Sequence, residues 1–172
     1  MQLESTGPDV WLFRCVRGPQ HADRDHVWSP TPLVVDLDRR TGLGEELGVY
    51  DDLLRCVEPG ERVEYGVVEH RFAAVSPDAY RDLLVRYGHT SLAPTKYSTS
   101  SFLSHALAQL GREGLLVVTS VDATGYWRYL RPVPAFARPE TPPDIETTSW
   151  AGYASHHGID PATWPASAAL RR

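Results

Sequence analysis

The chain has 172 residues, of which 42% are hydrophobic and 23% are charged, values typical of a globular protein. No apolar run reaches the roughly 18 residues that a membrane helix needs, and the N-terminus has no signal-peptide pattern, so we expect a cytoplasmic protein that does not span a membrane. The net charge of −5 argues against a chain that binds nucleic acid over its whole surface, because phosphate contacts need cations. Nearly every base is arginine, with Lys96 the single lysine, a bias typical of a GC-rich bacterial genome.

The charge is distributed unevenly along the chain. Residues 1–69 hold 7 basic and 14 acidic side chains, a net charge of −7. Residues 70–138 hold 8 basic and 4 acidic side chains, a net charge of +4, and residues 139–172 hold 2 and 4, a net charge of −2. The middle section is therefore where we expect any surface that binds an anionic partner.

The first 40 residues predict a β extension. Residues 9–17 are rich in large apolar side chains and predict a strand, residues 18–32 are polar and predict a loop, and residues 33–37 predict a second strand. The two strands would form a hairpin that caps the rest of the chain or exchanges with a partner chain. Cys15 and Cys56 both lie in apolar surroundings and predict buried, unreactive thiols.

An amphipathic helix is predicted from about Glu45. Its apolar residues recur at helical spacing, and the pair Pro59-Gly60 would end it. The apolar residues are Leu47, Tyr50, Leu53, Leu54 and Val57. Residues 62–72 are rich in Val and Tyr and predict a strand.

Two helices and two strands are predicted next. Ser76, Pro77 and Asp78 suit a helix start, and Gly88 suits its end. A second helix is predicted from about Ser98, followed by a strand at 115–121, a turn at 122–125 and a returning strand at 126–133. The apolar stripe of that second helix would consist of Phe102, Leu103, Ala106, Leu107 and Leu110.

This order of elements resembles the winged helix-turn-helix superfamily over roughly residues 45–132. The similarity is greatest where the second helix ends and leads into a strand. The residues that carry it are Leu103, Leu107, Leu110, Gly114, Leu115 and Leu116. The resemblance implies an α+β fold with a winged-helix domain at 41–133 and a wing at 117–129, its tip at residues 123–125. Residues 134–172 predict a Pro-rich linker and an aromatic C-terminal arm that docks through Trp150, Tyr153, Ile159 and Trp164.

The resemblance implies binding of double-stranded DNA, with the second helix in the major groove. The candidate contact residues follow from that placement: Lys96, Tyr97, Ser98, Thr99, Ser100, Ser101, Ser104, His105, Arg112, Arg128 and Arg131. The Ser/Thr run also suits a plain helix cap, and Arg128 and Arg131 also suit charges that protect a strand edge. The helix start has no arginine, the commonest guanine reader. Trp127 and Tyr129 alternate on one face and predict core packing.

Two other functions stay open. One is a winged-helix scaffold for protein–protein interaction, which suits the acidic flanks and would show the basic surface interrupted by Asp78, Asp82 or Asp122. The other is a metal-dependent enzyme acting on nucleic acid through Asp36 and Asp38, with Glu64 and Glu69 as further carboxylates.

Enzyme and metal motifs are weak in this sequence. His21, Asp23, Asp25 and His26 form the best metal candidate, but their spacing matches no standard motif, and no enzyme signature occurs. The sequence therefore favours a regulator of transcription or an accessory DNA-binding factor with no cofactor, no metal and no catalytic residues. A homodimer is expected where two half-sites are read.

Overall fold

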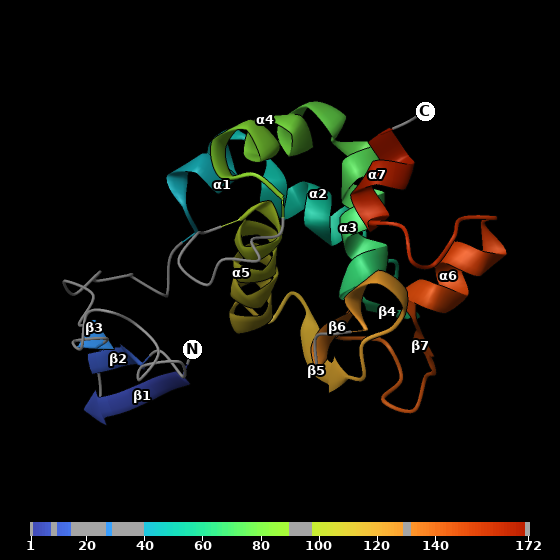
Figure 1. Cartoon of the computed structure of the whole chain (residues 1–172). Helices are drawn as coiled ribbons and strands as arrows, with labels where there is room; N and C mark the ends of the chain where they lie inside the picture. The colour runs from blue at the N-terminus through green and yellow to red at the C-terminus, as the bar shows by residue number, and fades with distance from the viewer. Residues whose placement is uncertain are drawn as a thin grey trace. The chain divides into compact units, whose positions relative to one another are not determined.

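The computed structural model describes residues 40–89, 98–128 and 132–170, together with the strands of the N-terminal segment (Figure 1). The chain divides into two units, residues 1–37 and 38–172. The first unit contains β1 (Gln2–Gly7), β2 (Val10–Arg14) and β3 (Val27–Trp28), antiparallel in the order β1-β2-β3. Strand β2 confirms the strand predicted within residues 9–17. The strand predicted at 33–37 and Cys15 lie outside the described residues.

The second unit combines helices with a four-stranded sheet, which confirms the α+β class. Its sheet has the order β5-β6-β4-β7, with β6 antiparallel to both β5 and β4, and β7 parallel to β4. The strands are β4 (Arg62–Glu64), β5 (Val117–Val121), β6 (Val133–Ala137) and β7 (Thr147–Thr148). The helices are α1 (Gly42–Glu46), α2 (Val49–Arg55), α3 (Tyr65–Val75), α4 (Pro77–Tyr87), α5 (Thr99–Arg112), α6 (Trp150–His156) and α7 (Pro165–Leu170), with the 3₁₀ helix η2 at Gly125–Trp127.

The helix predicted from Glu45 is two short helices. Gly48 separates α1 from α2 and has φ of 65°, a left-handed conformation that glycine adopts without steric cost. Tyr50 and Leu53 of α2 are buried, as their spacing predicted. The break turns the chain at Gly48 while keeping the apolar side of α2 against the core.

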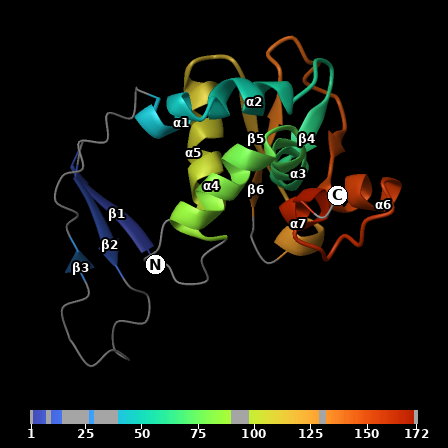
Figure 2. The same cartoon turned by 90° about the horizontal axis from the view of Figure 1, so that it is seen from above.

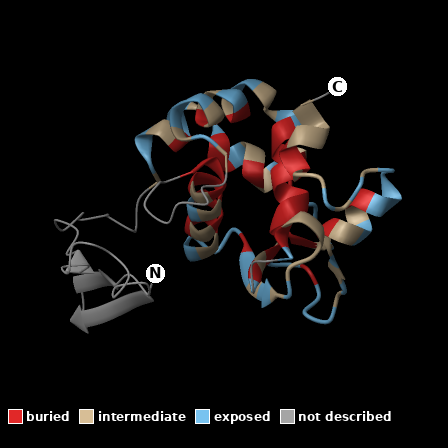
Figure 3. Cartoon of the chain, viewed as in Figure 1, coloured by how far each residue is buried: buried red, intermediate tan, exposed pale blue. Residues whose placement is uncertain are grey.

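The strand predicted at 62–72 is wrong for most of its length. Only Arg62–Glu64 is a strand, and the chain then turns directly into helix α3. Residues 65–70 are all buried, so α3 has neighbours on every side and lacks the polar face that identifies a surface helix (Figure 3). Tertiary packing therefore overrides the β propensity of this Val- and Tyr-rich segment.

The returning strand predicted at 126–133 is wrong at residues 126–128, while residues 129–131 lie outside the described residues. Gly125–Trp127 forms η2, and the strand β6 begins only at Val133. Pro134 pairs with Ser120 of β5 but lies beyond the residues of β6 that pair with β4, so its missing N–H costs the sheet little. The density of prolines after 133 therefore does not prevent a strand.

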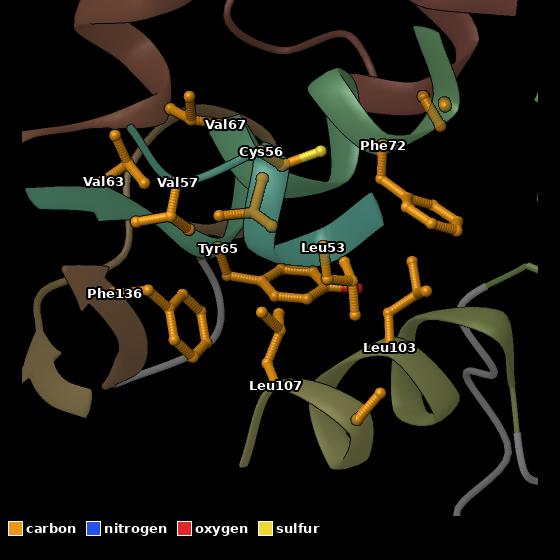
Figure 4. Packing of buried hydrophobic residues seen from close by; sticks show 14 of the residues in the cluster. Leu53, Cys56, Val57, Val63, Tyr65, Val67, Phe72, Leu103, Leu107 and Phe136 are labelled. Carbon is orange, nitrogen blue, oxygen red and sulfur yellow. The ribbon is translucent and has the colours of Figure 1, made fainter. Parts of the chain in front are cut away.

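The core lies between α2, α3, α5 and the sheet. Leu103 and Leu107 of α5 point toward Tyr65 and Leu53, while Phe136 approaches from the sheet (Figure 4). All five residues of the predicted apolar stripe of α5 are buried, which confirms the amphipathic pattern. Helices α4 and α5 begin within one residue of the predicted starts.

The C-terminal residues pack against the same core. Trp150 is fully buried, and Tyr153, Ile159 and Trp164 pack against the core cluster. Helix α7 lies along α3 in both views (Figures 1 and 2). The aromatic residues of this segment therefore dock on the body, as their sequence predicted.

Candidate nucleic-acid interface

The first turn of α5 is fixed to the body by its own hydroxyl groups. Ser98, Thr99 and Ser100 are all buried. Ser98 caps the helix by accepting from the N–H of Ser101 at 3.2 Å, and Thr99 donates to the carbonyl of Gly88 at 2.7 Å. Ser100 donates to Glu69 at 3.1 Å. These three hydroxyl groups stabilise the position of α5 and do not lie on its outer face.

The outer face of α5 is polar and carries one arginine. Ser101 and Ser104 are partly exposed, His105 and Arg112 are exposed, and Ala108 lies between them. Their spacing of three or four residues places all five on one side of a helix. Figure 2 shows α5 and the short loop, residues 113–116, that joins its end to β5. The stripe Ser101–Ser104–His105–Ala108–Arg112 is called the α5 outer face below.

The C-terminal end of α5 carries a net positive charge. Arg112 donates to the side-chain carbonyl of Gln109 at 2.6 Å and 3.0 Å. Gln109 in turn donates to Glu113 at 3.0 Å, and Arg40 forms an ion pair with Glu113 at 2.8 Å. Since Arg40 neutralises Glu113, the net charge at this end of the helix is that of Arg112. The two hydrogen bonds to Gln109 also limit the movement of the Arg112 guanidinium.

The environment of His105 favours the uncharged form of its ring. Partial burial of the ring, followed by the nearby Arg112 guanidinium, lowers the pKa of His105. A neutral imidazole presents one donor and one acceptor rather than a charge. His105 therefore contributes a polar ring to the α5 outer face rather than cationic attraction.

Residues 122–128, which follow β5, are folded onto the body. Thr124 hydrogen bonds to Glu64, and the N–H of Tyr126 donates to the carbonyl of Pro161 at 2.8 Å. Trp127 is buried, as predicted, and lies edge-on to Tyr65 with ring centroids 5.4 Å apart. The predicted tip at residues 123–125 is consequently anchored. Arg128, directly after η2, is exposed.

Three of the predicted contact residues, Lys96, Tyr97 and Arg131, lie outside the described residues, as does Tyr129. The eight that are described separate into two groups. The buried group is Ser98, Thr99 and Ser100, and the group at the surface is Ser101, Ser104, His105, Arg112 and Arg128. The structure therefore brings four of the surface residues together on α5, with Arg128 after η2.

Acidic residues that would interrupt a basic surface lie on other elements. Asp78 and Asp82 belong to α4 and pair with Arg81 and Arg86 of the same helix at 3.1 Å each. Asp122 follows β5 and is exposed. The α5 outer face itself contains no acidic residue.

Two buried carboxyl groups, those of Glu64 and Glu69, link separate elements of the fold. The sequence indicated this role only weakly. Glu64 and Glu69 have no exposed surface, and each accepts hydrogen bonds from several elements. Both were considered above as partners of Asp36 and Asp38, which lie outside the described residues. The available signal was an acidic residue within a continuous apolar run, which is unusual unless the side chain is paired.

Metal ligation has no support within residues 40–89, 98–128 and 132–170. No group of three or more His, Cys, Asp or Glu side chains there could hold an ion. The cluster of His21, Asp23, Asp25 and His26 lies outside the described residues. Among the described helices, none is long and apolar enough to cross a bilayer.

Comparison with protein-family models, curated protein sequences and solved structures finds no match.

Proposed function

We propose that residues 38–172 contain a winged helix that binds double-stranded DNA through α5. The sheet order β5-β6-β4 supports this proposal, because a winged helix places its first strand beside the last strand of the wing hairpin. Helices α4 and α5 precede that hairpin, so α5 takes the place of the helix that reads the major groove. The protein would act in the bacterial cytoplasm as a transcriptional regulator or an accessory DNA-binding factor.

The α5 outer face is the observation on which this proposal rests. It presents the His105 ring and the Arg112 guanidinium, and Ala108 at its middle is small enough for close approach. Ser101 and Ser104 are partly exposed, and their hydroxyl groups also hydrogen bond to Ser98 at 3.0 Å and to Tyr65. Hydroxyl groups and imidazole can meet base edges or phosphates, and the guanidinium can meet a phosphate. The set is uncharged or basic throughout, as an anionic partner requires.

The folded segment between β5 and β6 shapes the proposed contact. Because η2 is held against the C-terminal residues, α5 makes the central contact and Arg128 makes a peripheral one. A small contact surface favours weak binding by a single copy, and two copies reading two half-sites would bind more tightly. A homodimer is therefore part of the proposal.

The test is binding to random duplex DNA as salt rises from about 50 to 200 mM, the range over which phosphate contacts lose affinity steeply. An Arg112→Ala, Arg128→Ala double variant removes two exposed cations. We expect weaker binding, with a slope of log K against log salt that is less steep by about 2. Arg81→Ala is the matched control, since this exposed arginine lines a groove with Ala169 and Leu170, away from α5.

Loss of binding in the double variant but not in Arg81→Ala supports the α5 outer face as the DNA surface. A slope change of about 1 in Arg81→Ala, half that of the double variant, would indicate a general charge effect and would remove α5 from the proposal. No binding by the wild-type chain at the lowest salt would overturn DNA binding itself.

A second candidate function, a protein–protein scaffold, is favoured by the exposed edge of the sheet. Strand β5 is the outer strand among those described, it is uncharged, and Val117 and Val118 are 42% and 44% exposed. Native edges usually carry charges or proline that prevent pairing. Antiparallel pairing of two copies about Thr119 would set no like charges opposite each other. Sedimentation of wild type and Val118→Lys tests whether two copies pair through β5. A dimer that persists in the variant would exclude β5 as the contact between the copies.

A further inference from the structure

One buried carboxyl group joins helix α3 to three other parts of the unit. The Oε1 atom of Glu69 accepts from the hydroxyl of Tyr80 in α4 at 2.8 Å and from Ser100 in α5 at 3.1 Å. It also accepts from the indole N–H of Trp164, just before α7, at 3.4 Å. The Oε2 atom is buried and has no hydrogen-bond partner. Glu69 thus collects three donors on one oxygen and leaves the other unsatisfied.

No positive charge compensates this carboxyl group among its described neighbours. The titratable groups that act on it or respond to it are Tyr65 of α3, Tyr80 of α4 and Tyr126 of η2. Helix α5 contributes only a serine hydroxyl, and the C-terminal residues contribute only the indole of Trp164. Burial raises the pKa of Glu69 from 4.5 to about 7, and this effect outweighs the three hydrogen bonds, which lower it.

Trp164 is the most easily displaced of the three donors. Its hydrogen bond is the longest, and it is partly exposed, whereas Tyr80 is fully buried within an 11-residue helix. Its ring lies against His89, with centroids 3.6 Å apart, and against Tyr80 at 6.1 Å. An ionised Glu69 gains free energy when water reaches it. Displacement of Trp164 would let water reach the carboxyl group of Glu69.

We propose that Glu69 and Trp164 form a proton-controlled latch that holds residues 161–170 against α3. The protonated carboxyl group keeps the latch closed, and the ionised group favours its opening. This device does not depend on DNA binding, because it involves the buried side of α5 and not the α5 outer face. Its effect is to make the packing of the C-terminal segment respond to pH near neutrality.

Native-state hydrogen exchange measured by mass spectrometry tests the latch. The open state exposes Glu69 with an ordinary pKa of 4.5 against about 7 when closed, which by itself raises the open population about 10-fold from pH 6 to pH 8. Release of His89 from Trp164 returns the pKa of His89 from about 4 to 6.5 and opposes this rise by about 4-fold. We expect protection of residues 161–170 to fall about 2-fold over that range, after correction for the intrinsic effect of pH on amide exchange. Glu69→Gln should reverse this change, because only the opposing effect of His89 remains, and the exposed Glu140→Gln should retain it.

Trp164→Phe provides a second test should Glu69→Gln fail to fold. This change keeps an aromatic ring but removes the indole donor, so the pKa of Glu69 should rise further and the opening should move to higher pH. A pH response that is the same in Glu69→Gln and wild type overturns the latch. So does a wild-type response that is equal in residues 161–170 and in α5, because the whole unit would then be opening. The latch is also overturned if the pH dependence of exchange in residues 161–170 is the same in Trp164→Phe as in wild type.

Discussion

Thr124 and Glu64 are joined by two hydrogen bonds although 60 positions separate them in the sequence. The hydroxyl of Thr124 donates to Oε2 at 2.7 Å, and its backbone N–H donates to Oε1 at 3.3 Å. The backbone N–H of Trp150 donates to the same Oε2 atom at 2.8 Å. One carboxylate at the end of β4 therefore fixes both the segment between β5 and β6 and the start of α6.

Glu64→Ala should destabilise the unit by about 3 kcal/mol, because it leaves buried donors of Thr124 and Trp150 without an acceptor. Thr124→Val removes one hydroxyl and should cost about 1 kcal/mol. Chemical denaturation measures both, and the double variant gives their coupling energy. Glu140→Ala, on an exposed turn, is the control and should change stability by less than about 0.5 kcal/mol. If Glu64→Ala lost no more stability than the control Glu140→Ala, this hydrogen-bond arrangement would be contradicted.

Gly66 allows α3 to approach two tryptophan side chains. A Cβ atom at this position would lie 2.9 Å from Trp127 and 2.9 Å from Trp150, both of which are buried. Gly66→Ala should therefore destabilise the unit by about 1–3 kcal/mol through overpacking. Gly42→Ala is the matched control, because nothing lies within 4 Å of its added Cβ. Thermal unfolding of both variants checks this, and equal melting temperatures would show that α3 shifts without cost.

The sequence predicted correctly the helices that have one buried face and one exposed face. Helix α5 has a buried stripe and a polar face, so its spacing alone located it, and the same holds for α4. Helix α3 has no polar face, because α7, α6 and the sheet surround it, and its Val and Tyr content instead suggested a strand. Periodicity cannot identify an element that is buried all round.

The candidate site was predicted in part for a related reason. Sequence placed Ser98–Ser101 at the start of a helix, but a run of similar hydroxyl residues does not reveal which ones turn inward. That depends on acceptors that are distant in the sequence, such as Glu69 for Ser100 and Gly88 for Thr99. Glu64 and Glu69 were noted only as acidic residues, because their donors come from segments far along the chain.

Cys56 should be chemically inert in the folded protein. Its thiol is 1% exposed, and burial raises the pKa to about 12, so the reactive thiolate is scarce at neutral pH. In a Cys15→Ser variant, Cys56 is the single thiol of the chain. We expect no reaction with a thiol reagent under native conditions and one thiol per chain after denaturation. Rapid labelling of the native variant would contradict the burial of α2 against the core.

His89 should make the unit sensitive to acid. Burial beside Trp164 lowers the pKa of His89 from 6.5 to about 4, so the folded state binds fewer protons than the unfolded state between these values. Stability from this group is then complete above pH 6.5 and is lost as the pH falls toward 4. Because the ring is only about half buried, we expect a loss on the order of 1 kcal/mol.

The measurement for His89 is the difference in unfolding free energy between wild type and His89→Gln at pH 4, 5 and 7. A difference is needed because Glu69 acts in the opposite direction: its raised pKa makes stability fall as the pH rises from 4.5 to about 7. His89→Gln should lose less stability than wild type on going from pH 7 to pH 4. His157→Gln, at an exposed position after α6, should follow wild type. If His89→Gln also follows wild type, the ring is hydrated in the folded state and does not contribute to acid sensitivity.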